Sequence, residues 1–222
     1  MEKIEINNVK YAYSRIAKEF HCTRPVPWSW IIDFYKKVYN KYPTAKILDH
    51  GCGGGRNMTN IYIDEEKTIK TEFNFMGVDN CEEFVNIAQK NGNNVLYGDL
   101  CDLPYEDNIF ESVISVASFH HLSTEERRYK AMKEIHRVMK VGGLGCMSVW
   151  SKRQPKNSKN YERFRYGDNI VPWKNKKGEI IVDRYYYIFK QYELETLFLQ
   201  CGFIVTSWNW EHGNEIIQFL KY

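Results

Sequence analysis

The chain has 222 residues, of which 43% are hydrophobic and 27% are charged, and its formal net charge is only +3. This length and composition are typical of one well-packed core, so we expect a single domain spanning residues 1–222. No apolar run approaches the roughly 18 to 20 residues that a membrane-spanning helix requires, and the polar residues 1–5 do not resemble a signal peptide. We therefore expect no membrane partner and a location in the cytoplasm or the nucleus.

Helices are predicted over residues 7–20 and 27–41, within an N-terminal helical region that spans residues 1–42. Pro25 and Pro27 suit the entrance of the second helix. A strand over 46–49 then runs into glycines and a helical segment. The same alternation recurs with strands over 74–79, 95–97 and 112–117. It indicates an α/β fold with a mostly parallel sheet and helices on both faces.

The second half of the chain continues this alternation and then changes it. Ser123 and Glu126 fit a capping box that opens a helix, which we expect to end at Gly142 and Gly143. A strand near 145–150 precedes a basic insertion, 151–184, which we expect to be a long loop.

A helix over 191–200 and strands over 203–210 and 215–220 follow. The turn 211–214 between the last two strands contains Gly and Asn, which suit a hairpin. We therefore predict a sheet of seven strands that ends in an antiparallel hairpin.

Positive charge is concentrated in one segment. Residues 151–181 contain nine Lys or Arg and three Asp or Glu, a local charge of +6 that leaves −3 on the rest of the chain. Such a local field is expected where a polyanion docks on one face, although a solvated loop without a partner has the same composition.

The six cysteines are too scattered for the closely spaced pairs that zinc sites use. We expect reduced, mostly buried thiols and no metal site.

A glycine-rich turn, Asp49-His50-Gly51-Cys52-Gly53-Gly54-Gly55, follows the first strand. Open α/β sheets bind ligands at this position. A dinucleotide site needs a small residue where this chain has Arg56, which argues against NAD. The turn resembles motif I of class I S-adenosylmethionine-dependent methyltransferases, an acidic residue followed by Gly-x-Gly. Gly77-Val78-Asp79 and Gly98-Asp99-Leu100 agree with that family, whose fold is Rossmann-like.

The resemblance implies a site for S-adenosylmethionine built on Gly51 and Gly53. Asp49 is expected near the amino group of the cofactor, Asp79 at the ribose hydroxyls and Asp99 at the adenine amino group, beside a backbone contact from Leu100. Arg24 or Arg15 is a candidate for the cofactor carboxylate, and a surface charge is the alternative interpretation of either. Asn80 and Ser115 complete the predicted cofactor-binding set.

Three further elements are similar to the eukaryotic tRNA wobble-uridine carboxymethyl methyltransferases. They are Arg24-Pro25-Val26-Pro27-Trp28, the block from Ser118 to Arg128 that contains His120-His121 and Ser123-Thr124, and Val171-Pro172-Trp173 with Arg184-Tyr185-Tyr186-Tyr187. The chain departs from that family in its short insertion and in Tyr187, where the family has His. The resemblance implies methyl esterification of the carboxymethyl group on the wobble uridine of a tRNA anticodon loop.

This chemistry needs alignment more than proton transfer. A carboxylate with a pKa of about 4 is already ionised at neutral pH, so no general base is needed. A dry pocket favours the step because the carboxylate and sulfonium charges cancel.

The resemblance implies catalytic roles for His120, Arg24, Arg184 and Tyr185, and stacking surface for an extruded base from Trp28, Tyr185 and Tyr186. Either His120 or His121 faces the methyl group. Trp28 and Trp173 are open to a packing role instead.

The resembled family acts as a heterodimer with a small zinc-binding activator protein. The strand near Val95–Tyr97 would lie at the edge of the sheet, where a partner can add a strand. Two other functions stay open. A methyltransferase of small metabolites would use the same cofactor motifs, and a non-catalytic scaffold would keep only the fold.

Overall fold

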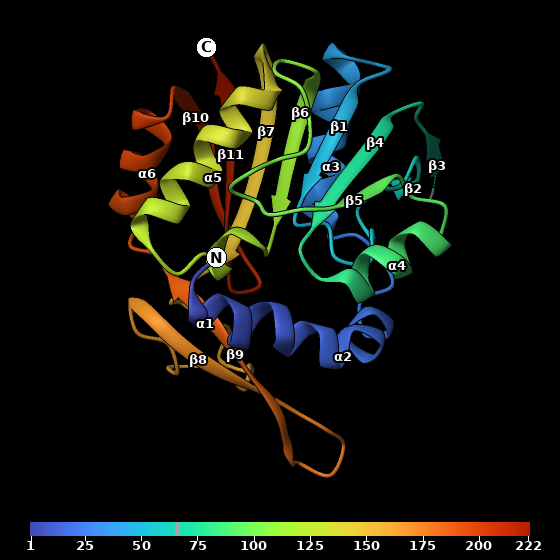
Figure 1. The fold of residues 1–222 in the computed structure, drawn as a ribbon. Helices are drawn as coiled ribbons and strands as arrows, with labels where there is room; N and C mark the ends of the chain where they lie inside the picture. Colours follow the sequence, from blue (N-terminus) through green and yellow to red (C-terminus); the bar gives the residue numbers. More distant parts are fainter. Residues whose placement is uncertain (65–66) are drawn as a thin grey trace.

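Seven strands form one open sheet in the order β10-β11-β7-β6-β1-β4-β5 (Figure 1). The computed structural model describes residues 1–64 and 67–222. β11 runs antiparallel to both of its neighbours, β7 and β10, and the other neighbouring pairs are parallel. The predicted α/β sheet with an antiparallel C-terminal hairpin is therefore confirmed, as is the edge position of β5.

The elements follow one another in the predicted alternation. The strands are β1 (Lys46–His50), β2 (Ile61–Asp64), β3 (Lys67–Lys70), β4 (Asn74–Asp79), β5 (Val95–Tyr97), β6 (Phe110–Val116), β7 (Met139–Trp150), β8 (Gly167–Lys174), β9 (Ile180–Ile188), β10 (Phe203–Glu211) and β11 (Asn214–Lys221). The helices are α1 (Lys3–Glu5), a π-helical turn (Ile6–Lys10), α2 (Tyr11–Cys22), α3 (Ser29–Lys41), α4 (Glu82–Lys90), a 3-10 turn (Phe119–His121), α5 (Glu125–Val138) and α6 (Gln191–Gln200).

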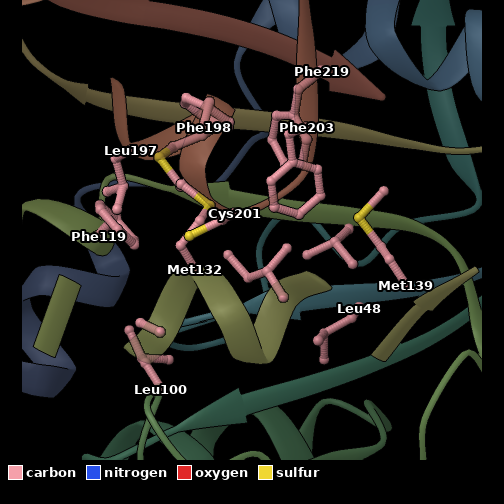
Figure 2. Packing of buried hydrophobic residues seen from close by; sticks show 14 of the residues in the cluster. Leu48, Leu100, Phe119, Met132, Met139, Leu197, Phe198, Cys201, Phe203 and Phe219 are labelled. Atoms are coloured by element: carbon pink, nitrogen blue, oxygen red, sulfur yellow. The ribbon is translucent and has the colours of Figure 1, made fainter. Parts of the chain in front are cut away.

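Helices cover both faces of the sheet, so its central strands are apolar on both sides. Ile47 of β1 packs in a cluster with α3, whereas the next residue, Leu48, packs in the cluster that contains α5 and α6 (Figure 2). Successive side chains of a strand point to opposite faces, and each large apolar side chain that is buried stabilises the fold by roughly 1.5–3 kcal/mol. The packing of both faces holds the strand ends, and thus the loops that follow them, in place.

The first helices of the chain, unlike α3, do not cover either face of the sheet. α1, the π-helical turn and α2 form one continuous stretch that lies across the carboxyl ends of the parallel strands, next to β8 and β9 (Figure 1). Tyr13 and Ile16 of α2 pack with Phe84 of α4 and Tyr185 of β9. The predicted helices over 7–20 and 27–41 are confirmed, and the first begins earlier than expected.

The helix predicted from Ser123 to Gly142 differs at both ends. Thr124 is its N-cap and accepts the backbone N–H of Arg127 at 3.2 Å, because the hydroxyl of Ser123 instead donates to Glu5. α5 ends at Val138, and β7 begins at once with Met139. The buried ammonium of Lys221 donates to the carbonyls of His136 and Met139, both at 2.7 Å. A contact from the last strand thus satisfies the carbonyls where the helix ends.

The prediction of a long loop over the basic insertion 151–184 is wrong for part of it. Its second half belongs to an antiparallel hairpin of β8 and β9 that projects from the body of the protein (Figure 1). The hairpin of β2 and β3 was not predicted. The turn between β10 and β11 was predicted. Its residues His212 and Gly213 both have positive φ, as in a type I′ hairpin. In the described residues of the chain, no helix is both long and apolar enough to cross a membrane.

Candidate cofactor and substrate site

A cavity of about 350 Å³ is lined by the carboxyl ends of the central strands and by residues of the N-terminal helices. Segments distant in the sequence line it. They are the turn Gly51–Gly54 with Arg56, the strand ends at Asp79 and Asp99, the segment from Val116 to Leu122, the side chains Tyr13 and Arg24, and Tyr186 with the turn at His212. Open α/β sheets place ligands at this edge, so the cavity is the candidate site.

The glycine turn approaches other segments of the chain too closely for a side chain. Gly51 has φ of +83°, and a Cβ there would lie 2.3 Å from the Cβ of Ser118. A Cβ on Gly54 would lie 2.3 Å from Nδ1 of His21 in α2. The turn therefore presents bare backbone to the cavity, and α2 closes over it.

Asp49 is a fully buried carboxylate, and neither of its oxygens has a hydrogen-bond partner in the described chain. Burial raises its pKa to about 7, and the charge of Asp79 adds to this effect while Arg56 opposes it. An unpaired buried carboxylate is costly unless a cation approaches it. Asp49 is not itself in the cavity wall, but Arg56 and Asp79 are.

Asp79 ends β4 and is positioned by the turn. Its Oδ2 accepts the backbone N–H of Gly53 at 2.8 Å, and its Oδ1 accepts that of Cys81 at 2.9 Å. Burial raises the pKa of Asp79 to about 6, although these two hydrogen bonds act to lower it. Asn80, the next residue, also lines the cavity.

Asp99 is held by a cation from α5. Burial alone would raise the pKa of Asp99, but the Cys101 N–H and the Arg127 guanidinium together hold it below its ordinary value. Nη2 of Arg127 contacts both oxygens, at 2.8 and 2.9 Å, and its Nε pairs with Glu5 at 2.7 Å. Glu5 of α1, which sequence analysis did not identify, thereby ties the N-terminal helix to this side of the cavity.

Ser115 lies behind the cavity and does not contribute to its wall. Its hydroxyl contacts Nδ1 and the carbonyl oxygen of His50, both at 3.3 Å, and Oγ of Ser118 at 3.0 Å. His50 also reaches the carbonyl of Leu100 at 3.2 Å through Nε2. Ser115 therefore supports the turn from beneath, and the geometry gives it a positioning role.

His120 and His121 both line the cavity, and their partners fix opposite tautomers. Nδ1 of His120 accepts the backbone N–H of Trp150 at 3.0 Å, so in the neutral ring the proton is on Nε2, which has no partner in the described chain. Nδ1 of His121 lies 2.7 Å from the carbonyl oxygen of Tyr185 and must donate to it. Burial lowers the pKa of His121 to about 3 and that of His120 well below its ordinary value, so both rings are neutral.

A directed chain of hydrogen bonds starts at His121. Its Nε2 accepts from the hydroxyl of Tyr13 at 3.1 Å, because Nδ1 already carries the proton. The oxygen of Tyr13 then accepts from Tyr186 at 3.0 Å, and the oxygen of Tyr186 accepts from Nη1 of Arg184 at 2.8 Å. Arg184 is thus connected to the cavity through Tyr186 and does not line it.

Tyr185, predicted as catalytic, faces away from the cavity. Its hydroxyl donates to Asp168 at 2.6 Å, and its ring is buried in the cluster under α2. Neighbouring residues of a strand point to opposite sides, so Tyr186 faces the cavity and Tyr185 does not. Burial and Asp168 raise the pKa of Tyr185 far above its ordinary value.

Two arginines that line the cavity, Arg24 and Arg56, form no ion pair within the described residues. Arg24 lies 3.8 Å above the ring of Phe20, and Arg56 lies 5.5 Å from the ring of Trp28. Neither they nor Arg184 form an ion pair within the described residues. Burial lowers the pKa of Arg56 to about 10 and that of Arg24 below its ordinary value. Arg15 is exposed and outside the cavity wall.

The tryptophans separate into two groups. Trp28 lines the cavity and stacks on His212 at 6.4 Å between ring centroids, whereas Trp173 packs outside it, against Phe20 of α2. Trp150, which sequence analysis missed, lines the cavity and stacks on Tyr186 at 4.1 Å. That face of Tyr186 is therefore covered by protein.

Five of the six cysteines are buried, and Cys22 is exposed. Among the residues that the structure describes, no three His, Cys, Asp or Glu side chains are grouped so that they could hold a metal ion.

S-adenosylmethionine fits the residues of this cavity. The amino group of the cofactor would supply a cation for Asp49. The guanidinium of Arg24 or Arg56 would hold the cofactor carboxylate. The bare backbone of the turn permits a close approach, and Asp79 and Asp99 keep acceptor capacity for hydroxyl and amino donors.

Comparison with known proteins agrees with this geometry. The methyltransferase domain family matches residues 48–147. A putative methyltransferase of Encephalitozoon cuniculi is 32% identical over 207 residues, which cover 91% of this chain and 88% of that protein. The tRNA (carboxymethyluridine(34)-5-O)-methyltransferase of Schizosaccharomyces pombe is 28% identical, over 96% of each chain. Some other curated relatives are longer, and the chain spans about a third of their length.

Solved structures share the fold. A putative methyltransferase of Haloferax volcanii, in a complex with the methyltransferase activator Trm112, superposes with a TM-score of 0.60 at 17% identity. The match covers 96% of each chain.

The close approach at Gly51 predicts the effect of a single methyl group. Gly51→Ala should weaken binding of S-adenosylhomocysteine by about 100-fold or more, because the Cβ clashes with Ser118 and the φ of +83° is strained. Gly92→Ala is the matched control, since Gly92 has φ of +84° with nothing within 4 Å of a Cβ. If calorimetric titration finds equal affinities for the two variants, the glycine turn at Gly51 is not part of the cofactor site.

The raised pKa of Asp49 predicts a pH dependence. Because the pKa rises from 3.8 to about 7 on folding, the folded chain holds this proton more tightly, and stability should fall as pH rises from about 4 to about 7. Asp49→Asn should flatten this decline in the free energy of unfolding, measured by urea denaturation at pH 5 to 8. It should also weaken cofactor binding at least tenfold. The exposed Asp183→Asn should do neither; an unchanged slope in Asp49→Asn would contradict the assignment.

Proposed function

Since the chain belongs to the S-adenosylmethionine-dependent methyltransferases, we propose that it methylates the carboxymethyl group of the wobble uridine, at position 34 of a tRNA anticodon, to give the methyl ester. The observation that carries this proposal is that Arg24 and Arg56 line the cavity without an ion pair in the described residues, and that Arg184 lies behind the wall on Tyr186. Cations that are partly or fully removed from water without a carboxylate partner favour an anionic ligand. The cofactor carboxylate needs only one of them, and a carboxylate substrate accounts for the others.

The arginines divide between two carboxylates in this proposal. Arg56 follows the glycine turn and interacts with Asp49, so it is assigned to the cofactor carboxylate. Arg24, in the N-terminal helical region, is assigned to the substrate. Arg184 contributes its positive charge through Tyr186, and is a positioning residue by this reasoning.

The reaction requires that the substrate carboxylate is oriented and that water is excluded from the site. The bound cofactor supplies an electrophilic methyl group on a sulfonium. The substrate carboxylate is ionised at neutral pH and needs no base, which agrees with two histidines that stay neutral. His120 offers its Nε2–H as a donor that orients the carboxylate, and the Trp150 N–H fixes that tautomer. Aromatic side chains around these donors exclude water.

The surface next to the cavity suits a polyanion. All nine basic residues of 151–181 are exposed, on the segment that follows β7 and on the hairpin of β8 and β9. Residues 154, 158 and 160 of the same segment line the cavity. A tRNA backbone bound along this segment would bring an extruded base to the site, and Trp28 offers it a stacking surface.

The substrate assignment is tested by mass spectrometry of tRNA nucleosides. The chain is incubated with activator, S-adenosylmethionine and tRNA that carries carboxymethyluridine, and we expect the methyl ester to appear. A preparation that binds cofactor but leaves the carboxymethyl nucleoside unchanged would rule this substrate out and favour a small carboxylate metabolite.

His120→Ala should lower kcat by about 10²–10³ while cofactor affinity holds, which is the usual effect of removing one preorganised donor. His136→Ala, on α5 outside the cavity, is the control. An unaffected rate in His120→Ala would remove this residue from the reaction.

We also propose that a small zinc-binding activator protein binds the free edge of β5. In the described chain β5 pairs only with β4, and Leu96 and Tyr97 are exposed. An edge strand with apolar exposed side chains can accept a strand from a partner. The Haloferax volcanii complex, which contains a methyltransferase of the same fold, supports this proposal.

Two charge substitutions at opposite sheet edges test the partner site. Leu96→Lys on β5 should abolish co-purification with the activator, because it buries a charge in the interface. Ile204→Lys on β10, the other edge strand, places the same charge at a similarly exposed position and should leave the complex intact. Loss of the complex only in Ile204→Lys would move the interface to β10.

A further inference from the structure

A second cavity, of about 710 Å³, lies beside the first and has no role in the chemistry described above. The segment from Ser151 to Tyr166 forms one wall, and residues of α6, β10 and β11 form the other. Gln154 lines both cavities, and residues 158 and 160 of the same segment line the first. One stretch of chain therefore separates two adjoining hollows.

The shared wall is anchored to the sheet. Nε2 of Gln154 donates to the carbonyl of Gly213 at 2.9 Å, and Nε1 of Trp210 donates to the carbonyl of Arg153 at 2.9 Å. The Ser151 N–H donates to the Gly213 carbonyl at 2.8 Å. The segment between the two cavities is thus held by hydrogen bonds to β10 and to the turn between β10 and β11.

Aromatic side chains line the second cavity. Tyr161 is 43% exposed and Tyr166 is 49% exposed, an unusual degree of exposure for rings that line a hollow. Phe164 and Trp208 lie deeper, and Phe164 packs on Trp150 of the first cavity at 5.3 Å. The exposed ring of Tyr161 offers a face on which a planar group can stack, and the ring of Tyr166 offers one beside the ammonium of Lys152, which lies 4.9 Å from its centroid.

The charges of this cavity are asymmetric. Lys152, Arg153 and Arg165 are exposed at its wall, and none of them forms an ion pair within the described residues. Two acids also line it, Glu162 and Glu215, and the oxygens of Glu215 accept from Ser151 at 2.5 Å and from Trp208 at 2.9 Å. Three cations against two acids leave a net charge of +1 on the lining, and Lys152 lies 4.9 Å from the ring of Tyr166.

We propose that the second cavity binds a nucleotide that neighbours the methylated one in the same RNA, its base stacked on Tyr161 or Tyr166 and its phosphate near Lys152 and Arg165. Stackable rings beside unpaired cations suit a base with its phosphate, whereas a protein segment would leave the cations unmatched. The inference rests on the proposed function and adds to it a second point of contact that sets the position of the RNA. With one base in each cavity, the substrate base cannot slide along the site.

Paired substitutions test the stacking. With activator present, Tyr161→Ala combined with Tyr166→Ala should raise KM for an anticodon stem-loop RNA about tenfold, while kcat at saturating RNA and cofactor affinity stay the same. Tyr129→Ala combined with Tyr192→Ala removes two similarly exposed rings from α5 and α6 and should change nothing. Tyr161→Phe combined with Tyr166→Phe should retain the wild-type KM. Equal KM in the alanine pair and the wild type would overturn the proposal.

Crosslinking gives a readout that does not depend on turnover. A stem-loop RNA with 4-thiouridine next to the wobble position should crosslink to residues 161–166, as mapped by peptide mass spectrometry. Crosslinks confined to the hairpin of β8 and β9 would overturn the proposal even if methylation proceeds. Crosslinks at 161–166 with no methylation of carboxymethyluridine would instead retain the second RNA site and reject the proposed substrate.

Discussion

Buried charge without a partner is the constraint on which the site depends. Asp49 has no hydrogen-bond partner in the described chain, and Arg184 is buried among aromatic rings without a carboxylate. Burial of Asp49 costs folding free energy and raises its pKa to about 7, although Arg56 opposes this effect, whereas Tyr186 and the surrounding rings stabilise the cation of Arg184. Both groups lie behind the cavity wall, Asp49 beside Arg56 and Asp79 and Arg184 beside Tyr186, and a ligand with an amino group and an anionic ligand would complement them.

The polar side chains of the cavity are held in single arrangements. A backbone N–H fixes the tautomer of His120, and a backbone carbonyl fixes that of His121. From His121 onward, each donor in the chain through Tyr13 and Tyr186 has one direction, which ends at Arg184. A network with every proton assigned presents the same donors at all times, so little reorganisation is needed when an anion arrives.

The N-terminal helices and the segment after β7 complete a site that the sheet alone leaves open. α2 covers the glycine turn through His21, and Glu5 of α1 joins the Arg127–Asp99 pair. Residues 154, 158 and 160 close the opposite side of the cavity wall. Segments of the chain outside the sheet therefore form much of the cavity wall, whereas Asp79 and Asp99 are at the ends of its strands.

Local patterns in the sequence were enough to predict the seven strands of the main sheet, their mostly parallel arrangement and the glycine turn with Asp49, Asp79 and Asp99, because strand alternation and strand-end motifs involve residues close together in the chain. They did not predict that α5 stops at Val138, where Lys221, 82 to 85 residues away, donates to the carbonyls of His136 and Met139. Nor did they separate Tyr185 from Tyr186, because a run of tyrosines has no polarity that marks the inner face. Arg56 was adjacent to a recognised motif and could have been identified; Tyr13, Glu5 and Trp150 carried no such local signal. Only the tertiary structure decides which side chains share a cavity, because hydrogen bonds and burial there join residues that the sequence keeps far apart.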